Sequence, residues 1–207
     1  MTTPQDFNRS VYELLEVVRT ADLKQVGHLA ELAARINAVA RELAPAVVDE
    51  ERMQAGLAPT DYAFGAKATF DDPNEFFPYS PVIGNLNPIS PVANFDVVDG
   101  EIRGQVTLGA THNGPPGSVH GGMIALVMDE LLGCTCVAAD MGGFTGTLSI
   151  RYQGLVPLDT PVELHGWIDR QEGRKVFAKG EIRLGDQVLT TAEGIFIRSR
   201  DADTQEP

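Results

Sequence analysis

The chain has 207 residues, of which 43% are hydrophobic and 22% charged, a composition typical of globular proteins with a substantial core. Its net charge of −13 argues against general binding to nucleic acids or anionic membranes, because both require a basic surface on the protein. Small anionic ligands stay open, since a few local Lys or Arg side chains are enough to hold their phosphates.

Hydrophobic periodicity predicts helices at the start of the chain. One apolar stripe runs from Phe7 to Val18 and a second from Leu23 to Leu43, with Asp22 as a candidate N-cap between them. Pro45 is expected to end or kink the second helix, and residues 47–54 to form a short third turn. We interpret residues 1–56 as a helical extension docked on the main domain or on a partner subunit. The first residues do not have the pattern of a signal peptide, which favours a cytoplasmic protein.

Residues 57–86 are rich in Pro, Asp, Asn and aromatic residues, and their pattern indicates a linker or a loop that wraps the next domain. Strand patterns begin at residue 87, with a hairpin turn at Asp99-Gly100. Three more strand segments follow residue 143, and the last one splits at Gly185-Asp186. One helix enclosed by antiparallel strands predicts an α+β domain over residues 87–200, followed by a disordered tail at 201–207.

The enclosed helix is apolar on all sides between Met123 and Val137, which is typical of a buried helix with a sheet wrapped around it. Cys134 and Cys136 are expected to be small core residues, because side chains two apart on a helix diverge too far for a disulfide. Asp129 interrupts the apolar run. A carboxylate in such a helix needs either a structural partner or a function.

The start of this helix has its own chemistry. Gly121 and Gly122 leave backbone N–H groups open at the positive end of the helix dipole, which suits an oxyanion or a polarised carbonyl, and His120 precedes them. Gly122 and Asp129 lie on nearly the same side but about 10.5 Å apart along the axis, at about 1.5 Å per residue. If both act on one carbonyl, Asp129 therefore comes from a second subunit of a two-fold dimer. A capped, buried helix whose Asp129 makes an internal hydrogen bond is the alternative.

The loop GPPGSVHGG, Asp129 nine residues after His120, the strand TGTLSIRYQGLVPL and the ending EGRKVFAKGEI together resemble the hotdog-fold acyl-CoA thioesterases, in particular the phenylacetate-pathway-like and thioesterase-superfamily-member-4-like branch. The resemblance covers roughly residues 80–200 and leaves out the N-terminal helices. It implies a hotdog fold and hydrolysis of an acyl-CoA substrate, with CoA as part of the substrate and no separate cofactor. The alternative is a non-catalytic hotdog module that binds an acyl-CoA or a related ligand.

By position, the resemblance implies that Asp129 is the nucleophile or general base and that Gly122, with Gly121 beside it, polarises the thioester carbonyl. It assigns His120 to holding the thioester and Thr145 to orienting the water or the carboxylate. Candidates for the CoA phosphates are Arg151, Arg174 and Lys175, with Arg198 as a further one, while Asn113 either shapes the site or forms a simple turn.

The remaining expectations concern the surroundings of the site. No metal is expected, because the spacing of His112 and His120 matches no standard metal site. The wall of the acyl pocket is expected to come from Phe76, Phe77, the second half of the helix and the partner chain. We expect a homodimer, and the sequence leaves open whether dimers pair into a homotetramer.

Overall fold

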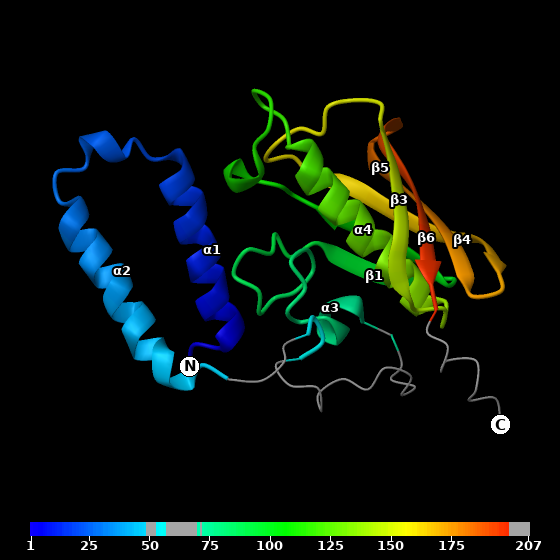
Figure 1. The fold of residues 1–207 in the computed structure, drawn as a ribbon. Coiled ribbons are helices and arrows are strands. Elements are labelled where there is room, and N and C mark those ends of the chain that lie inside the picture. The colour runs from blue at the N-terminus through cyan, green and yellow to red at the C-terminus, as the bar shows by residue number, and fades with distance from the viewer. Residues whose placement is uncertain (49–52, 57–69, 71, 199–207) are drawn as a thin grey trace.

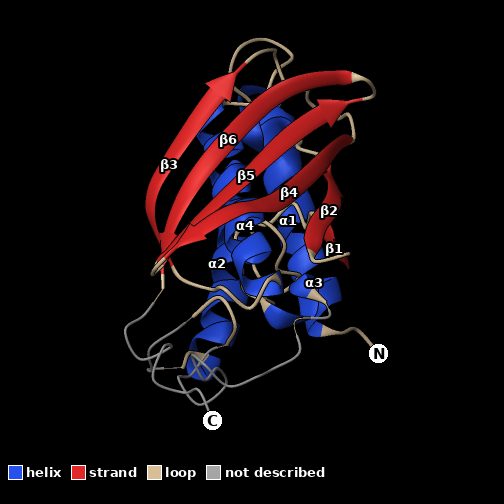
Figure 2. Cartoon of the chain, turned by 90° about the vertical axis from the view of Figure 1, so that its right-hand side faces the viewer, coloured by secondary structure: helices blue, strands red, loops and turns tan. Residues whose placement is uncertain are grey.

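The computed structural model describes residues 1–48, 53–56, 70 and 72–198. Among these residues, six strands form one antiparallel sheet in the order β1-β2-β4-β5-β6-β3, as Figures 1 and 2 show. The strands are β1 (Asn94–Val98), β2 (Glu101–Val106), β3 (Phe144–Tyr152), β4 (Val162–Glu172), β5 (Lys175–Leu184) and β6 (Gln187–Ile197). The predicted turns at Asp99-Gly100 and Gly185-Asp186 are confirmed, and Asp99, Gly100 and Gly185 all have the positive φ that such hairpin turns require.

Helix α4 (Gly121–Ala138) lies along the concave face of this sheet, which wraps around it (Figure 2). The predicted α+β hotdog architecture is therefore confirmed. Glycines in the sheet let the helix approach: a Cβ at Gly166 of β4 would lie 2.3 Å from Thr135 Oγ1. Cys134 and Cys136 are buried, free core residues as predicted, and burial raises the pKa of Cys136 to about 12.

One face of α4 departs from the prediction of a helix buried on every side. Gly121, Gly122, Ala125 and Asp129 stay at least partly exposed along it, whereas Val127 and Leu131 on the opposite face are almost completely buried. The sheet covers only the faces turned toward it, so this strip is left uncovered in a single chain. By length and composition α4 also qualifies as a candidate membrane span, but half of it is buried inside the protein, as in a core helix.

The N-terminal helices are α1 (Pro4–Thr20) and α2 (Leu29–Leu43), and neither contains a buried residue. The second helix begins at Leu29 instead of Leu23, because Asp22 caps a separate 3₁₀ turn at Leu23–Gln25. Pro45 lies in a 3₁₀ turn that follows Leu43, in agreement with its expected role. The predicted third turn is wrong where it is described, since Met53 and Gly56 form a β-bridge; residues 49–52 lie outside the described part.

The segment before the sheet packs as part of the core. Short helix α3 (Pro73–Phe76) is capped by Asp72, and the Asn74 amide donates hydrogen bonds to the Ile83 and Ala93 carbonyls at 2.9 and 2.7 Å. Val82 and Ile83 are almost completely buried. The described part of the predicted linker therefore wraps the domain; most of residues 57–71 and the predicted tail at 201–207 lie outside the described residues.

Candidate active site

The loop before α4 is held in shape by its own backbone and by Asn113. The Ser118 N–H donates to the Pro115 carbonyl at 2.9 Å, closing a turn in which Gly117 has a φ of +72°. The Asn113 amide donates to the Pro115 and Ser118 carbonyls, at 3.1 and 3.3 Å. Of the two roles left open for Asn113, the structure thus gives it the shaping of this loop.

His120 is the N-cap of α4. Its Nδ1 accepts a hydrogen bond from the Gly122 N–H at 3.0 Å, so a neutral ring in this position carries its proton on Nε2. The N–H of Gly121, the first residue of the helix, donates to no described residue. The open donor at this helix start is therefore the Gly121 N–H, while the Gly122 N–H is occupied by the cap.

Tyr152 closes this end of the site from the sheet. Its hydroxyl donates to the Gly121 carbonyl oxygen at 2.9 Å, and its ring lies beside the Gly121 Cα. Tyr152 is the last residue of β3, so the bond ties the edge of the sheet to the first turn of α4. The open Gly121 N–H lies in the preceding peptide unit, whose His120 carbonyl accepts hydrogen bonds from the Met123 and Ile124 N–H groups at 2.9 and 3.1 Å.

The predicted pair of Thr145 and Asp129 is present. The Thr145 hydroxyl donates to Asp129 Oδ1 at 2.9 Å, and Oδ2 has no described hydrogen-bond partner. Asp129 is only partly buried in the single chain, on the uncovered strip of α4. The carboxylate is thus oriented on one oxygen and open on the other.

Glu130, and not Asp129, is the acid of α4 whose burial costs free energy. This residue is only 9% exposed, accepts a hydrogen bond from Gln54 Nε2 at 3.3 Å, and has no described partner for its Oε1. Burial raises the pKa of Glu130, opposed by hydrogen bonds from Ser80 and Gln54 and assisted by the charge of Asp129. Sequence reasoning missed this residue because it depends on which loop covers the helix.

The candidate residues fall into two groups at opposite ends of β3. His120, Gly121 and Tyr152 lie at one end, whereas Asp129 and Thr145 lie at the other. Lys175 of β5 pairs with Ile197 of β6, and Ile197 also pairs with Phe144, which precedes Thr145 on β3. The Arg174-Lys175 turn therefore belongs to the second group. Tyr152 follows Thr145 by seven positions on β3, which is about 23 Å at about 3.3 Å per residue. The two groups are therefore kept apart within a single chain.

Arg151 belongs to neither group. It precedes Tyr152 on β3, so its side chain lies on the opposite face of the sheet, and it borders a shallow hollow there with Trp167 and Lys179. Arg198 lies at the Arg174 end, where its backbone N–H donates to the Arg174 carbonyl at 2.9 Å. Among the described residues, no group of three or more His, Cys, Asp and Glu side chains is arranged to hold a metal ion.

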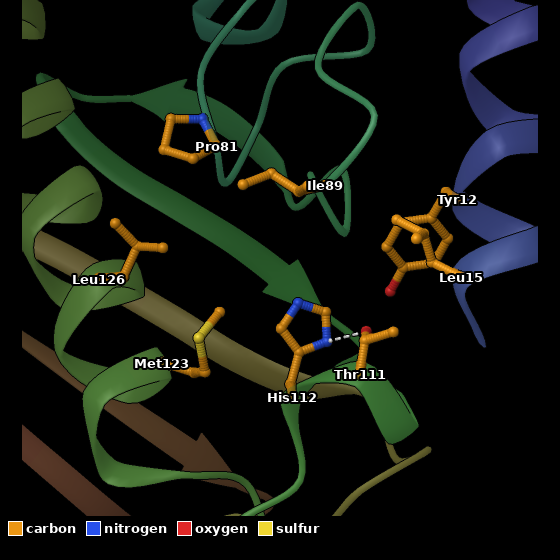
Figure 3. A pocket seen from close by; sticks show the side chains of 8 residues that line it. All are labelled: Tyr12, Leu15, Pro81, Ile89, Thr111, His112, Met123 and Leu126. Carbon is orange, nitrogen blue, oxygen red and sulfur yellow. Dashed lines mark hydrogen bonds between the residues drawn. The ribbon is translucent and has the colours of Figure 1, made fainter. Parts of the chain in front are cut away.

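A cavity of about 180 Å³ lies beside the first half of α4, and Figure 3 shows the side chains around it. It is lined by Met123 and Leu126 of α4, and also by Tyr12 and Leu15 of α1. Neither Phe76 nor Phe77 lines it; their rings pack edge to face on each other, 4.7 Å apart. The expected wall of the acyl pocket, from Phe76, Phe77, the second half of the helix and the partner chain, does not describe this cavity and stays a prediction.

Helix α1 is held at this cavity by polar contacts that sequence reasoning did not find. The Glu16 carboxylate accepts hydrogen bonds from the Ala110 and Thr111 N–H groups, at 2.7 and 3.1 Å, and from the Thr111 hydroxyl. Arg19 donates to Asn113 Oδ1 at 3.2 Å. Burial opposes ionisation of Glu16, but the Thr111 and Ala110 hydrogen bonds outweigh it and lower the pKa of this carboxyl.

His112 forms the floor of the cavity. Its ring is buried, and its Nδ1 lies 3.0 Å from the Thr111 hydroxyl, with the other ring nitrogen on the cavity side (Figure 3). Burial lowers the pKa of His112, partly opposed by the charge of Glu16. The ring is thus favoured in its neutral form.

Comparison with known proteins shows which family this part of the chain resembles. Residues 116–191 match the family model of the thioesterase superfamily. The chain is 35% identical over 92 residues to the human acyl-coenzyme A thioesterase THEM5, and 37% identical over 87 residues to THEM4 of Xenopus laevis. These matches cover 44% and 41% of this chain but only 37% and 39% of those proteins.

A solved structure resembles nearly the whole chain, including the N-terminal helices. This crystal structure of a thioesterase superfamily protein has a TM-score of 0.80 and 28% identity, and the match covers 95% of this chain and 91% of that one. Residues 116–191 are therefore similar in sequence to the thioesterase superfamily, and nearly the whole chain has the fold of a thioesterase superfamily protein.

Proposed function

We propose that this protein hydrolyses an acyl-CoA thioester to a free acid and CoA. The proposal rests on the open Gly121 N–H at the start of α4 and on the Asp129 carboxylate of the same helix, which is oriented by Thr145 of β3. Its relatives named acyl-coenzyme A thioesterases support the same substrate class. A thioester carbonyl is already electrophilic, so one fixed hydrogen-bond donor and one carboxylate are sufficient for its hydrolysis.

The chemistry assigns a role to each group. The Gly121 N–H, with the Nε2–H of His120 beside it, polarises the thioester carbonyl. Asp129 either takes a proton from the attacking water or attacks the carbonyl carbon itself. In both routes the C–S bond breaks, the acyl group gains the oxygen of water, and the CoA sulfur leaves as a thiolate that takes up a proton. The free Oδ2 of Asp129 is the oxygen available for this step.

The spacing of the two groups requires a second chain. Gly121 and Asp129 are eight residues apart, about 12 Å along the axis at about 1.5 Å per residue, too far for one carbonyl to contact both. Ala125 lies midway between them on the uncovered strip. If a second α4 crosses antiparallel at Ala125, Gly121 of each chain faces Asp129 of the partner subunit, and two complete sites form.

The surface around this strip suits such a dimer. Strand β3 is an edge strand, and most of its residues are exposed, with Phe144 at 63% and Tyr152 at 51%. An unprotected edge of nine residues is a template for another strand. In the proposed dimer the Arg174-Lys175 turn of the partner subunit comes to the Gly121 end, where it is available for the phosphates of CoA.

Release of CoA thiol from a panel of acyl-CoAs tests the activity. We expect hydrolysis by the wild type and a fall of at least about a hundredfold in Asp129→Asn, because the variant lacks the base or nucleophile. Asp140→Asn is the matched control: Asp140 is exposed and has a positive φ, which Asn tolerates. If the wild type binds acyl-CoAs but hydrolyses none, the protein is a binding module instead.

A further inference from the structure

The cavity beside α4 lies within reach of the proposed reaction centre. Met123 and Leu126 follow Gly121 by two and five residues, so they stand about 3 and 7.5 Å further along the helix axis. Leu126 is rotated by about 140° from Gly121, at about 100° per residue, so the cavity lies on another side of the helix from the Gly121 Cα. Its floor residue His112 lies at the start of α4, because the His112 carbonyl accepts a hydrogen bond from the His120 N–H at 2.8 Å. An acyl group whose carbonyl oxygen is held by the Gly121 N–H has this apolar space beside it.

The opposite wall of the cavity comes from outside the hotdog domain. Tyr12 and Leu15 of α1 face Met123 and Leu126 across the cavity, with Pro81 and Ile89 closing one side (Figure 3). Because α1 contains no buried residue, its position depends on contacts such as those of Glu16 and Arg19 with residues 110–113. The position of this wall is therefore set by the surface contacts of α1, which contributes no buried residue to the core.

The size of the cavity limits its occupant. Its volume of about 180 Å³ is slightly larger than the apolar cavity of about 150 Å³ that accommodates benzene in another protein. A single aromatic ring or a short aliphatic chain fits this space, and Leu15 is the aliphatic side chain that α1 contributes to its wall. The lining is apolar apart from Tyr12, Thr111 and His112.

We propose that helix α1 forms a wall of the acyl-binding cavity, and that Leu15 limits the acyl group to about the size of one ring. This inference rests on the proposed acyl-CoA hydrolysis. It assigns substrate selection to the N-terminal extension and leaves the reaction itself to α4 and β3.

Binding of non-hydrolysable analogues tests the inference separately from catalysis. The probes carry a methylene group between the acyl carbonyl and the CoA sulfur, and their acyl groups range from acetyl to myristoyl and include benzoyl. We expect the wild type to bind benzoyl and short chains best. Leu15→Ala should improve binding of the longer chains about tenfold, and Leu15→Trp should weaken binding of the benzoyl analogue about tenfold.

Val17→Ala is the matched control, because Val17 is 61% exposed on α1 and does not line the cavity. Leu15 is itself 38% exposed, so its substitutions are not expected to unfold the protein, and thermal unfolding checks this. An unchanged chain-length profile in both Leu15 variants overturns the inference while leaving hydrolysis by the wild type intact. A wild type that neither binds nor hydrolyses any acyl-CoA overturns the proposed function as well.

Discussion

At the scale of single residues, the first turn of α4 separates two neighbouring N–H groups by function. The Gly122 N–H is bonded to the ring of His120, whereas the Gly121 N–H is open, and its peptide unit is oriented by the hydrogen bonds that the His120 carbonyl accepts from the Met123 and Ile124 N–H groups. A donor fixed in this way does not have to reorganise when charge develops on a carbonyl oxygen. In the proposed mechanism, Gly121 contributes its N–H, and His120 contributes both the cap and its Nε2.

Replacement of Gly121 by proline isolates this donor. Proline is favoured at the first position of a helix and lacks only the N–H, and His120 already has the extended backbone that a residue before proline prefers. We expect kcat/KM for acyl-CoA hydrolysis to fall about 10²- to 10³-fold with the helix content unchanged by circular dichroism. Gly121→Ala keeps the N–H and should stay active; equal activity of the two variants would contradict the assignment.

Glu130 affects stability in the opposite sense to a paired carboxylate. Its folded pKa lies above the ordinary value near 4.5, so the folded state holds this proton more tightly than the unfolded state. The contribution to stability is therefore complete below pH 4.5 and is lost as the pH rises through the folded pKa.

Glu130→Gln removes this dependence. At pH 8 we expect the variant to unfold about 2–4 °C above the wild type, and the difference should shrink as the pH falls toward 4.5. Glu163→Gln, on an exposed residue of β4, makes the same change in net charge and should have little effect. A variant less stable than the wild type at pH 8 would show that the ionised carboxylate is favourable where it lies.

The contrast between Asp129 and Glu130 shows which features of the site can be predicted from residue patterns. Local spacing and the family motif were enough to predict the Asp129–Thr145 pair. The burial of Glu130 depends instead on Gln54 and Ser80, which pack onto α4 from a segment without any periodic pattern. Local sequence contains no information about which loop residue covers which helix residue, so only the tertiary structure distinguishes the two neighbouring acids.

At the scale of elements, the docking of α1 depends on the ionised Glu16. Its pKa is lowered by the hydrogen bonds it accepts, so this contribution is present above its ordinary value near 4.5 and is lost as the pH falls through the lowered folded value. The periodic stripe predicted the helix, but the stripe cannot tell which polar residue beside it finds a partner about 94 residues away in the sequence.

Glu16→Gln should loosen α1 without unfolding the hotdog domain. The neutral amide is a weaker acceptor, so we expect hydrogen exchange at the Ala110 and Thr111 amides to rise about five- to tenfold. Glu13→Gln is the control, because the Glu13 carboxylate contacts only Arg9 of the same helix among the described residues. Equal exchange in both variants would mean that other contacts hold α1.

At the scale of the whole molecule, the fold was predictable because hairpin turns and one apolar helix define it locally. The dimer stays a prediction, as do the cytoplasmic location and the pairing of dimers. Ala125→Trp tests the dimer, because a large side chain at the proposed crossing point keeps two α4 helices apart. We expect monomers by analytical ultracentrifugation and no hydrolysis, whereas Asp186→Trp, on an exposed turn, should stay dimeric and active.

Mixing defective subunits gives a second view of the same assembly. In a heterodimer of Asp129→Asn with Gly121→Pro, one site contains both mutations and the other contains neither. Random pairing of equal amounts should therefore restore about a quarter of the wild-type activity. No recovery, despite demonstrated heterodimers, would mean that each chain works alone.

The hydrogen bonds that Glu16 accepts from residues 110–111 have a further consequence for the choice of substrate. A residue change in the first twenty positions alters the cavity wall without touching the carboxylate or the donor that would break the thioester. Selectivity and reactivity then reside on separable stretches of chain that can vary independently. Variants with substitutions confined to α1 should therefore be the shortest way to change the preferred acyl group while the catalytic residues stay the same.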